Sequence, residues 1–207
     1  MPLEVSVDLD AAAAGRSHLH AHETARHTAA TMRSLRQAPL LRQITEDELD
    51  AVQALIERCD EYYVLTTGAG PKPTAARGVW DALPPDLPRG AKLTLGVYLP
   101  GLVGLVDVVR GWPRAKTWLI GLLLLAPDVR GRGVGAHAVS AIDAAAAEAG
   151  ATSLRVAVVH ANAPALAFWQ RLGFVEVPSM QPDTIALERE VAARTDPTAG
   201  REPSAAA

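Results

Sequence analysis

The sequence predicts an α/β domain in which helices flank a mixed, mostly antiparallel central sheet. Strand-like apolar runs at 92–99, 102–109 and 117–125 are joined by short connections rich in proline and glycine, as in an antiparallel meander. A glycine-rich segment at 130–135 then leads into a helical pattern, after which strand and helix patterns alternate. This order of elements is typical of helices packed on a mixed sheet.

The first part of the domain is predicted to be mainly helical. Residues 39–44 form a short strand-like run, and Thr45 is a good N-cap because three acidic residues follow it. The apolar spacing predicts a helix from there to about Arg58. Residues 62–64 fit a second short helix or an ordered connection, and 68–91 fit a long loop with at most one short helix.

The second part of the domain is predicted to alternate helices and strands. Apolar residues after Gly133 recur on one helical face until Gly150 ends the helix. Asn162 is a good N-cap for another helix, with a proline in its first turn. Three further strands are predicted, at 154–159, 174–177 and 183–191.

Composition limits the class of protein. With 207 residues, 49% of them hydrophobic, the chain fits one domain with a sizeable core. A net charge of -3 gives no reason to expect nucleic acid as a partner. The longest apolar run, 118–126, is too short to cross a membrane, and no secretory signal is recognisable. We therefore expect no membrane partner and a cytoplasmic location.

Three segments are predicted along the chain. Residues 1–36 hold few large apolar side chains and are expected to be loosely ordered or partly helical. Residues 37–191 form the domain, and 192–207 are expected to be a disordered tail. The single cysteine, Cys59, excludes an internal disulfide and is expected to be buried on a helix.

The first segment carries four histidines, which raises the question of a metal site. Their spacing does not match the H-E-x-x-H pattern of zinc proteases. We predict no dedicated metal site at these residues, which are His18, His20, His22 and His27.

The segment RGRGVG at 130–135 has the features of an anion site. Its three glycines let backbone N–H groups approach a ligand, and the helix that follows adds unpaired amides with partial positive charge. A tight turn is the alternative interpretation. No Lys-Ser/Thr follows the glycines, which excludes a Walker A loop, and the G-x-G-x-x-G pattern of Rossmann domains is absent.

Two motifs resemble those of the GNAT family of acyl-CoA-dependent N-acetyltransferases. The cofactor motif Q/R-x-x-G-x-G/A is matched by Arg130, Gly133 and Gly135. The later motif N-x-x-A-x-x-F/L-Y/W-x-x-x-G-F is matched by Asn162, Ala165, Phe168, Trp169, Gly173 and Phe174. The resemblance covers about 37–191 and implies a GNAT fold that transfers an acyl group from acetyl-CoA to a primary amine.

The resemblance also implies a set of cofactor-binding residues. Backbone groups of Leu123, Leu124 and Leu125 would face the pantetheine arm and the thioester. Asn162 would hydrogen-bond that arm and Phe168 would pack against it, although the leucines and Phe168 also fit plain core positions and Asn162 a plain helix cap. Backbone amides would hold the pyrophosphate at Arg130, Gly131, Arg132, Gly133, Val134 and Gly135.

The residues for proton transfer depart from the family pattern. Trp169 stands where many members have a tyrosine that acts as general acid, and an indole cannot be an acid near neutral pH. We therefore predict that water or another residue protonates the thiolate. Asp107 is our candidate for the general base, because it interrupts an apolar strand; an exposed strand position is the alternative. His160 at a strand end is a further titratable candidate.

The resemblance implies an acceptor pocket after the first helix, at Glu61, Tyr62 and Tyr63. Trp80 is a further candidate for this pocket, and core or edge packing is the alternative. The acceptor amine belongs to a small molecule or to a protein, and the protein is expected to be a monomer or a homodimer. Two alternatives remain open: a non-catalytic acyl-CoA-binding module on the same fold, and a nucleotide-binding protein that uses the glycine loop.

Overall fold

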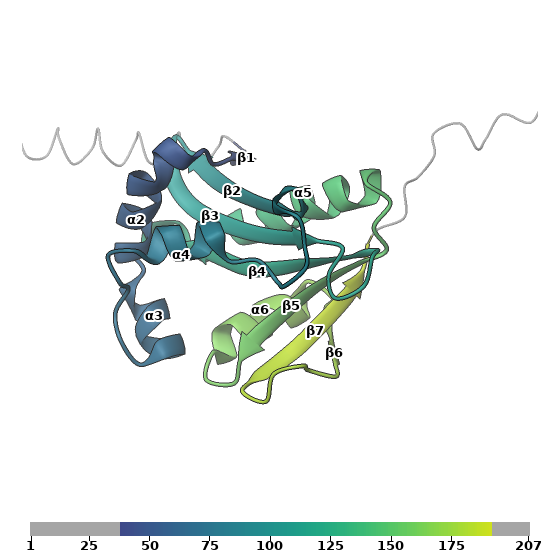
Figure 1. Ribbon diagram of the computed structural model, residues 1–207. Helices are drawn as coiled ribbons and strands as arrows, with labels where there is room; N and C mark the ends of the chain where they lie inside the picture. The colour runs from purple at the N-terminus through teal and green to yellow at the C-terminus, as the bar shows by residue number, and fades with distance from the viewer. Residues whose placement is uncertain (1–37, 192–207) are drawn as a thin grey trace, which may run out of the picture. The chain divides into compact units, whose positions relative to one another are not determined.

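One seven-stranded sheet organises residues 38–191, the part of the chain that the computed structural model describes (Figure 1). Its strand order is β1-β2-β3-β4-β5-β7-β6. The predictions for 1–36, including the four histidines, and for 192–207 lie outside the described residues.

β2, β3 and β4 form the predicted antiparallel meander, β1 adds an antiparallel strand beside β2, and β5 is parallel to β4. β7 is antiparallel to both β5 and β6, so the sheet is mixed and mostly antiparallel, as predicted. The strands are β1 (Leu40–Gln43), β2 (Lys92–Leu99), β3 (Gly101–Arg110), β4 (Thr117–Leu125), β5 (Ser153–Val159), β6 (Val175–Val177) and β7 (Thr184–Glu190).

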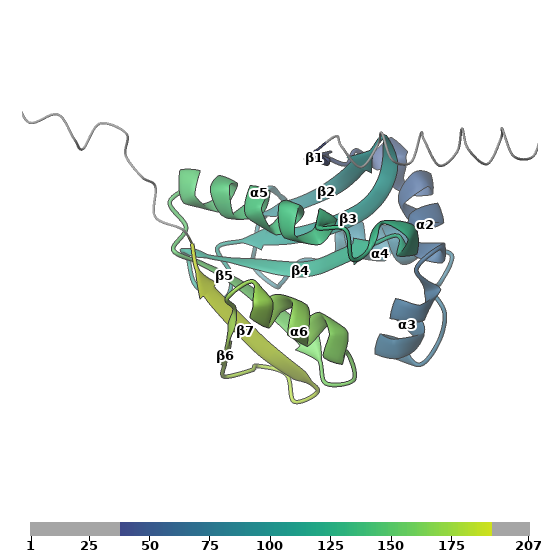
Figure 2. The same cartoon turned by 180° about the vertical axis from the view of Figure 1, so that it is seen from behind.

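Helices flank this sheet. Figure 2 shows α5 and α6 in front of one face, while α2, α3 and α4 gather at the end of the sheet away from β6 and β7. The α-helices are α2 (Leu49–Glu57), α3 (Asp60–Thr67), α4 (Ala75–Asp81), α5 (Val134–Glu148) and α6 (Ala163–Arg171). Short 3-10 helices are η1 (Glu46–Glu48), η2 (Arg89–Ala91) and η3 (Pro127–Val129).

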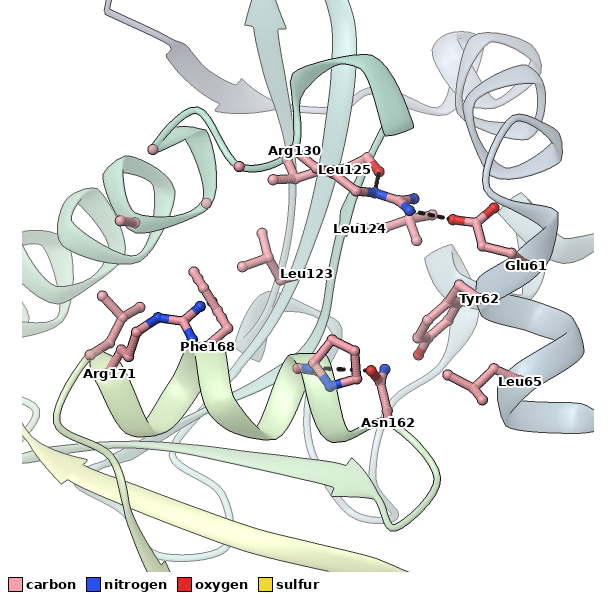
Figure 3. Close-up of a pocket in the computed structure, with 17 residues that line it drawn as sticks. Glu61, Tyr62, Leu65, Leu123, Leu124, Leu125, Arg130, Asn162, Phe168 and Arg171 are labelled. Carbon is pink, nitrogen blue, oxygen red and sulfur yellow. Dashed lines mark hydrogen bonds and ion pairs between the residues drawn. The ribbon is translucent and has the colours of Figure 1, made fainter.

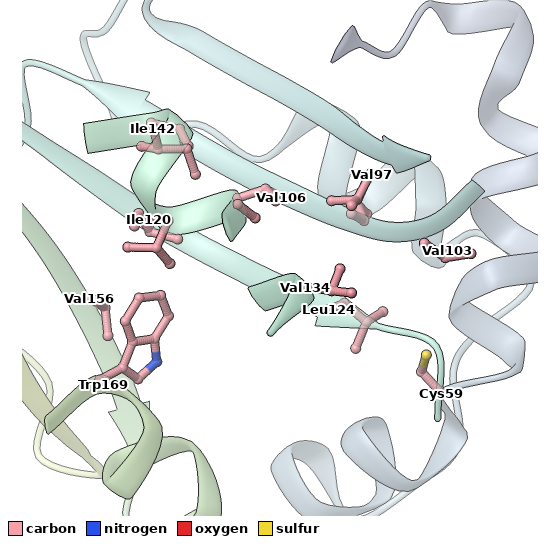
Figure 4. Close-up of a cluster of buried hydrophobic side chains, with 14 of the residues drawn as sticks. Cys59, Val97, Val103, Val106, Ile120, Leu124, Val134, Ile142, Val156 and Trp169 are labelled. Carbon is pink, nitrogen blue, oxygen red and sulfur yellow. The ribbon is translucent and has the colours of Figure 1, made fainter. Parts of the chain in front are cut away.

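The core lies between the sheet and the helices, and the inner strand β3 is buried along almost its whole length. Val106 of β3 and Ile120 of β4 are buried against Ile142 of α5 (Figure 4). Cys59 is fully buried in the same cluster, as predicted, but it lies in the turn between α2 and α3, as the N-cap of α3, and not on a helix. Removing these apolar groups from water provides the main driving force for folding, at about 25 cal/mol per Å².

The caps predicted from the sequence form where expected. Thr45 and Glu48 make a capping box, in which Glu48 Oε2 accepts from the Thr45 backbone N–H at 3.1 Å. Asn162 Oδ1 accepts from the backbone N–H of Ala165 at 3.2 Å and caps α6. The segment 68–91 contains the expected short α-helix, α4, and in addition the 3-10 helix η2, which was not predicted.

β4 and β5 pair only along their first halves, from Thr117↔Ser153 to Ile120↔Val156. The register between β3 and β4 shifts at the same level, because Asp107 pairs with Leu122 and Val108 with Ile120. Gly121 is therefore the extra residue of a β-bulge, which bends the strand. Beyond it the two parallel strands diverge and leave a wedge in the sheet, visible in Figure 1.

Candidate functional site

A cavity of about 660 Å³ lies between α3, the end of β4, the glycine loop and α6 (Figure 3). The residues predicted to bind a cofactor line it, except Arg132 and Val134: the side chain of Arg132 is exposed and that of Val134 is buried in the core. The predicted residues that do line it are Leu123, Leu124, Leu125, Arg130, Gly131, Gly133, Gly135, Asn162 and Phe168.

The glycine loop presents its backbone to this cavity. Gly131 and Gly133 have φ values of 70° and 81°, in the left-handed region that glycine adopts without steric cost. Gly133 is the N-cap of α5, and the His137 N–H donates to its carbonyl at 3.0 Å. The amides of the turn before His137 are those that a helix leaves without an internal acceptor. Such a turn attracts an anion.

Gly135 lets three elements approach closely beside the loop. A Cβ at this position would lie 3.2 Å from Cζ of Phe168 on α6 and 3.4 Å from Cδ1 of Leu125 on β4. A side chain here would push α6 away from α5 and change the width of the cavity.

Arg130 connects the loop to β4 and to α3. Its Nε donates to the Leu125 carbonyl at 2.7 Å, and its Nη1 lies 2.5 Å from Oε1 of Glu61. The Cys59 thiol donates to the same carbonyl at 3.5 Å, and burial raises its pKa. A buried thiol with a raised pKa is a core residue rather than a nucleophile.

Asn162 is both a helix cap and a cavity residue. Its Oδ1 is used by the cap on Ala165, and within residues 38–191 no hydrogen bond is recorded for its Nδ2 group. The two roles that the sequence left open for this residue are therefore compatible in geometry.

Sequence reasoning missed several lining residues. Arg171 is the most informative, because it lies one turn after Phe168 and extends beside it in Figure 3. The i, i+3 spacing on the capped helix could have found it. It adds a second cation to the cavity that holds Arg130. The other missed residues are Leu65, Ala136, Pro164, Ala165 and Leu172.

A second cavity of about 110 Å³ lies in the wedge between β4 and β5. Apolar residues of both strands line it, together with Thr66 of α3 and Trp169 of α6. It shares four lining residues with the larger cavity, so the two meet at Tyr62, Leu123, Asn162 and Ala165.

Trp169 is a packed core residue at the wall of this wedge. It is 5% exposed, and its ring contacts Phe168 and Phe174 edge-on at centroid distances of 5.0 and 5.1 Å. An indole cannot donate a proton near neutral pH, so the wedge contains no acid at this position.

Only two of the four residues predicted for the acceptor pocket line either of these cavities. Glu61 and Tyr62 line the larger cavity, and Tyr62 also lines the wedge. Tyr63 lines neither cavity, and its ring packs edge-on against that of Tyr62 at a centroid distance of 5.4 Å. Trp80 lines neither and lies under the guanidinium of Arg89 at 4.6 Å.

Asp107 lines neither cavity and forms a buried ion pair. Its Oδ1 lies 2.5 Å from Nζ of Lys92, which also donates to the Ala82 carbonyl at 2.7 Å. Burial raises the pKa of Asp107, and the Lys92 ammonium opposes that rise. The alternative of an exposed strand position is wrong, since Asp107 is 7% exposed. Its carboxylate is paired with Lys92, and its Oδ2 lies beside Gly121, which lines the wedge, so the role of Asp107 as general base stays a prediction.

His160 is exposed at the end of β5 and lines neither cavity. Among residues 38–191 no group of three or more His, Cys, Asp or Glu side chains is placed to hold a metal ion. No helix in that part of the chain is long and apolar enough to cross a bilayer.

Solved structures share this fold. An acetyltransferase from Thermus thermophilus superposes with a TM-score of 0.65 at 24% identity, over 74% of this chain and 97% of that one. The PaiA N-acetyltransferase from Thermoplasma acidophilum in complex with coenzyme A gives 0.57 at 13%, over 74% and 99%. The ribosomal-protein-S18-alanine N-acetyltransferase from Escherichia coli gives 0.55 at 13%, over 77% and 97%.

No curated protein matches the sequence. A sequence profile of the acetyltransferase (GNAT) family, however, matches residues 51–174, which is more than half of the chain and includes both motifs, the wedge and the glycine loop. The chain therefore belongs to the acetyltransferase (GNAT) family.

Proposed function

We propose that the protein transfers an acetyl group from acetyl-CoA to a primary amine of a small molecule or a protein. The observation that carries the proposal is the continuity of the site. The larger cavity begins at the helix-terminal amides and two arginines and meets the wedge between β4 and β5.

The larger cavity fits the chemistry of a CoA thioester from one end to the other. Gly131 and Gly133 expose amides for the pyrophosphate, while Arg130 and Arg171 supply positive charge. Family membership supports acyl-CoA as the ligand.

The middle of the cavity suits the pantetheine arm. Leu123 and Leu124 lie where β4 has left β5, so their backbone groups on that side are available to a ligand. The Nδ2 group of Asn162 would donate to an amide of the arm, and Phe168 forms an apolar wall. The Leu125 carbonyl already accepts from Arg130 and Cys59, which limits its part in binding.

The reaction follows from where the two cavities meet. With the arm along β4, the thioester lies at the mouth of the wedge, and an uncharged amine entering there can attack its carbonyl carbon. A C–N bond forms, the C–S bond breaks and the electron pair goes to sulfur. We propose that water accepts the proton of the ammonium, because the carboxylate of Asp107 is held by Lys92.

A second candidate function is a non-catalytic acyl-CoA-binding module. It is supported by Trp169, which stands where the family usually has a tyrosine as general acid. It predicts cofactor binding without turnover on any amine. A cytoplasmic location and a monomeric or homodimeric state stay predictions.

A thermal-shift series tests the binding half of the proposal. Acetyl-CoA or CoA at a hundredfold its Kd stabilises a protein by about 2.7 kcal/mol, which raises the Tm by several degrees. We expect a shift with acetyl-CoA and CoA, none with ATP or NAD, and loss of the shift in Gly133→Glu. A matched Gly70→Glu variant, whose position faces open space outside the cavity, keeps the shift. A shift with ATP or NAD alone would point to a nucleotide-binding protein instead.

A further inference from the structure

We propose that the hydroxyl of Tyr62 protonates the departing CoA sulfur, in place of the family tyrosine that Trp169 replaces. This inference rests on the proposed acyl transfer and adds the proton donor that the reaction needs. It assigns a residue of α3, rather than α6, to this step.

The position of Tyr62 carries the inference. Four residues line both cavities, and Tyr62 alone among them has a titratable side chain; the others are Leu123, Asn162 and Ala165. In Figure 3 its ring points from α3 across the cavity towards Asn162. A thioester that lies in the larger cavity and is attacked from the wedge must react where the two meet. The phenol is therefore beside the bond that breaks.

Competing acids do not fit the step. Among the described residues that line either cavity, the other titratable side chains are Glu61, Arg130 and Arg171, all in the larger cavity only. Arginine stays charged at any relevant pH, so it stabilises a thiolate without protonating it. Glu61 is ion-paired with Arg130 at 2.5 Å and does not line the wedge.

The hydroxyl is available while the ring is held. In the described part of the chain no hydrogen bond is recorded for the Tyr62 hydroxyl, whereas its backbone carbonyl accepts from Thr66 Oγ1 at 2.8 Å. The ring of Tyr63 packs against it at right angles. Burial raises the pKa of Tyr62, which keeps the phenol in its proton-bearing form.

The proton balance of the step is simple. As the amine nitrogen bonds to the carbonyl carbon and the C–S bond breaks, sulfur receives the electron pair and takes the proton from Oη of Tyr62. The phenolate regains a proton from water, and the proton lost by the amine goes to solvent. The products are the N-acetyl amine and the CoA thiol, and Tyr62 is unchanged after one turnover.

A binding experiment tests this contact without needing to know the acceptor. The affinities of CoA and desulfo-CoA, which lacks the thiol, are measured by calorimetry at pH 9.5, where an alkyl thiol is substantially ionised. Burial raises the pKa of Tyr62, and that of Tyr63 to about 12, so both phenols keep their protons there. The variants are Tyr62→Phe and the matched control Tyr63→Phe, whose ring lines neither cavity.

We expect the wild-type protein and Tyr63→Phe to bind CoA about tenfold more tightly than desulfo-CoA, as a hydrogen bond to a charged sulfur provides. Tyr62→Phe should bind both compounds with the affinity that the wild-type protein has for desulfo-CoA. An unchanged preference for CoA in Tyr62→Phe, or no preference in the wild-type protein, would overturn the assignment of Tyr62 alone. Failure of the wild-type protein to bind either compound would overturn the proposed function and this inference with it.

Discussion

Arg130 of the glycine loop and Glu61 of α3 form an ion pair of 2.5 Å in the wall of the larger cavity. The side chains are 40% and 50% exposed, so solvent screens the pair and its contribution to stability is small, about 0–1 kcal/mol. Its position matters more than its strength, because it places a carboxylate beside the proposed anion site. It also joins the helix that carries Tyr62 to the loop that would hold the pyrophosphate.

Removing that carboxylate should strengthen CoA binding. Glu61→Gln leaves Arg130 anchored by the Leu125 carbonyl and takes a negative charge away from the pyrophosphate. We expect CoA affinity to rise about two- to threefold at low salt and the gain to shrink at high salt, since salt screens exposed charges. Calorimetry at two ionic strengths measures this. Weaker binding at both would show that Glu61 is needed to position Arg130.

Arg171 should contribute to binding through its charge. Arg171→Ala removes a guanidinium that lines the cavity, and we expect CoA affinity to fall about tenfold, as for loss of a charge-assisted contact. Arg132→Ala is the matched control, because its side chain is exposed and does not line the cavity. Equal losses of CoA affinity in the two variants would show that the effect comes from the overall charge of the protein and not from the position of Arg171.

Glycines with different backbone conformations should respond oppositely to alanine. Gly133→Ala places a side chain at φ 81°, which costs about 1–2 kcal/mol even though nothing lies within 4 Å of the new Cβ. Gly78→Ala in α4 also meets open space, but the helical backbone accepts it, so stability should rise by about 0.5–1 kcal/mol. Urea unfolding measures both. Equal effects of the same sign would contradict the conformational explanation.

The buried pair of Lys92 and Asp107 should be structural. Lys92→Met leaves a buried carboxylate without its partner and should cost about 3–5 kcal/mol at pH 7. The double variant Lys92→Met/Asp107→Asn removes both charges and should recover most of that loss. Acyl transfer that persists in the double variant would show that Asp107 is not the general base. Loss of acyl transfer in a double variant that still folds would support Asp107 as the general base.

The same pair predicts a direction for the pH dependence of stability. Burial raises the pKa of Asp107 in the folded state above its unfolded value, so the folded state binds more protons in the window between the two values. Stability contributed by Asp107 is therefore present below the unfolded pKa and lost as pH rises through the folded pKa. In Lys92→Met the folded pKa rises further, and the variant should regain more stability than the wild-type protein when acidified from pH 7 to 5. Urea midpoints that fall on acidification would contradict this sign.

Local patterns allowed much of the fold and the glycine loop to be predicted. The caps at Thr45 and Asn162 and the helix after Gly133 depend on residues that are close in the sequence, so local patterns are enough to predict them. The pairing of Lys92 with Asp107 could not be predicted in this way, because the register of β2 on β3 brings the two residues together.

The sequence also did not show which of two neighbouring tyrosines lines the cavities. Tyr62 and Tyr63 look equivalent in the sequence, yet consecutive residues on a helix point about 100° apart, and Tyr62 alone of the two lines the cavities. Arg171 was missed because a single cation near the end of a helix is common on exposed faces. The position of α6 against the glycine loop makes it part of the site.

Turnover tests the central claim most directly. The purified protein is incubated with acetyl-CoA and a panel of primary amines (a polyamine, an aromatic amine, lysine and a peptide with a free N-terminus), and acetylated product is measured by mass spectrometry. We predict enzyme-dependent acetylation of at least one amine, abolished in Gly133→Glu. Tight binding of acetyl-CoA with no acetylated product from any amine would contradict the account and identify a non-catalytic acyl-CoA-binding module.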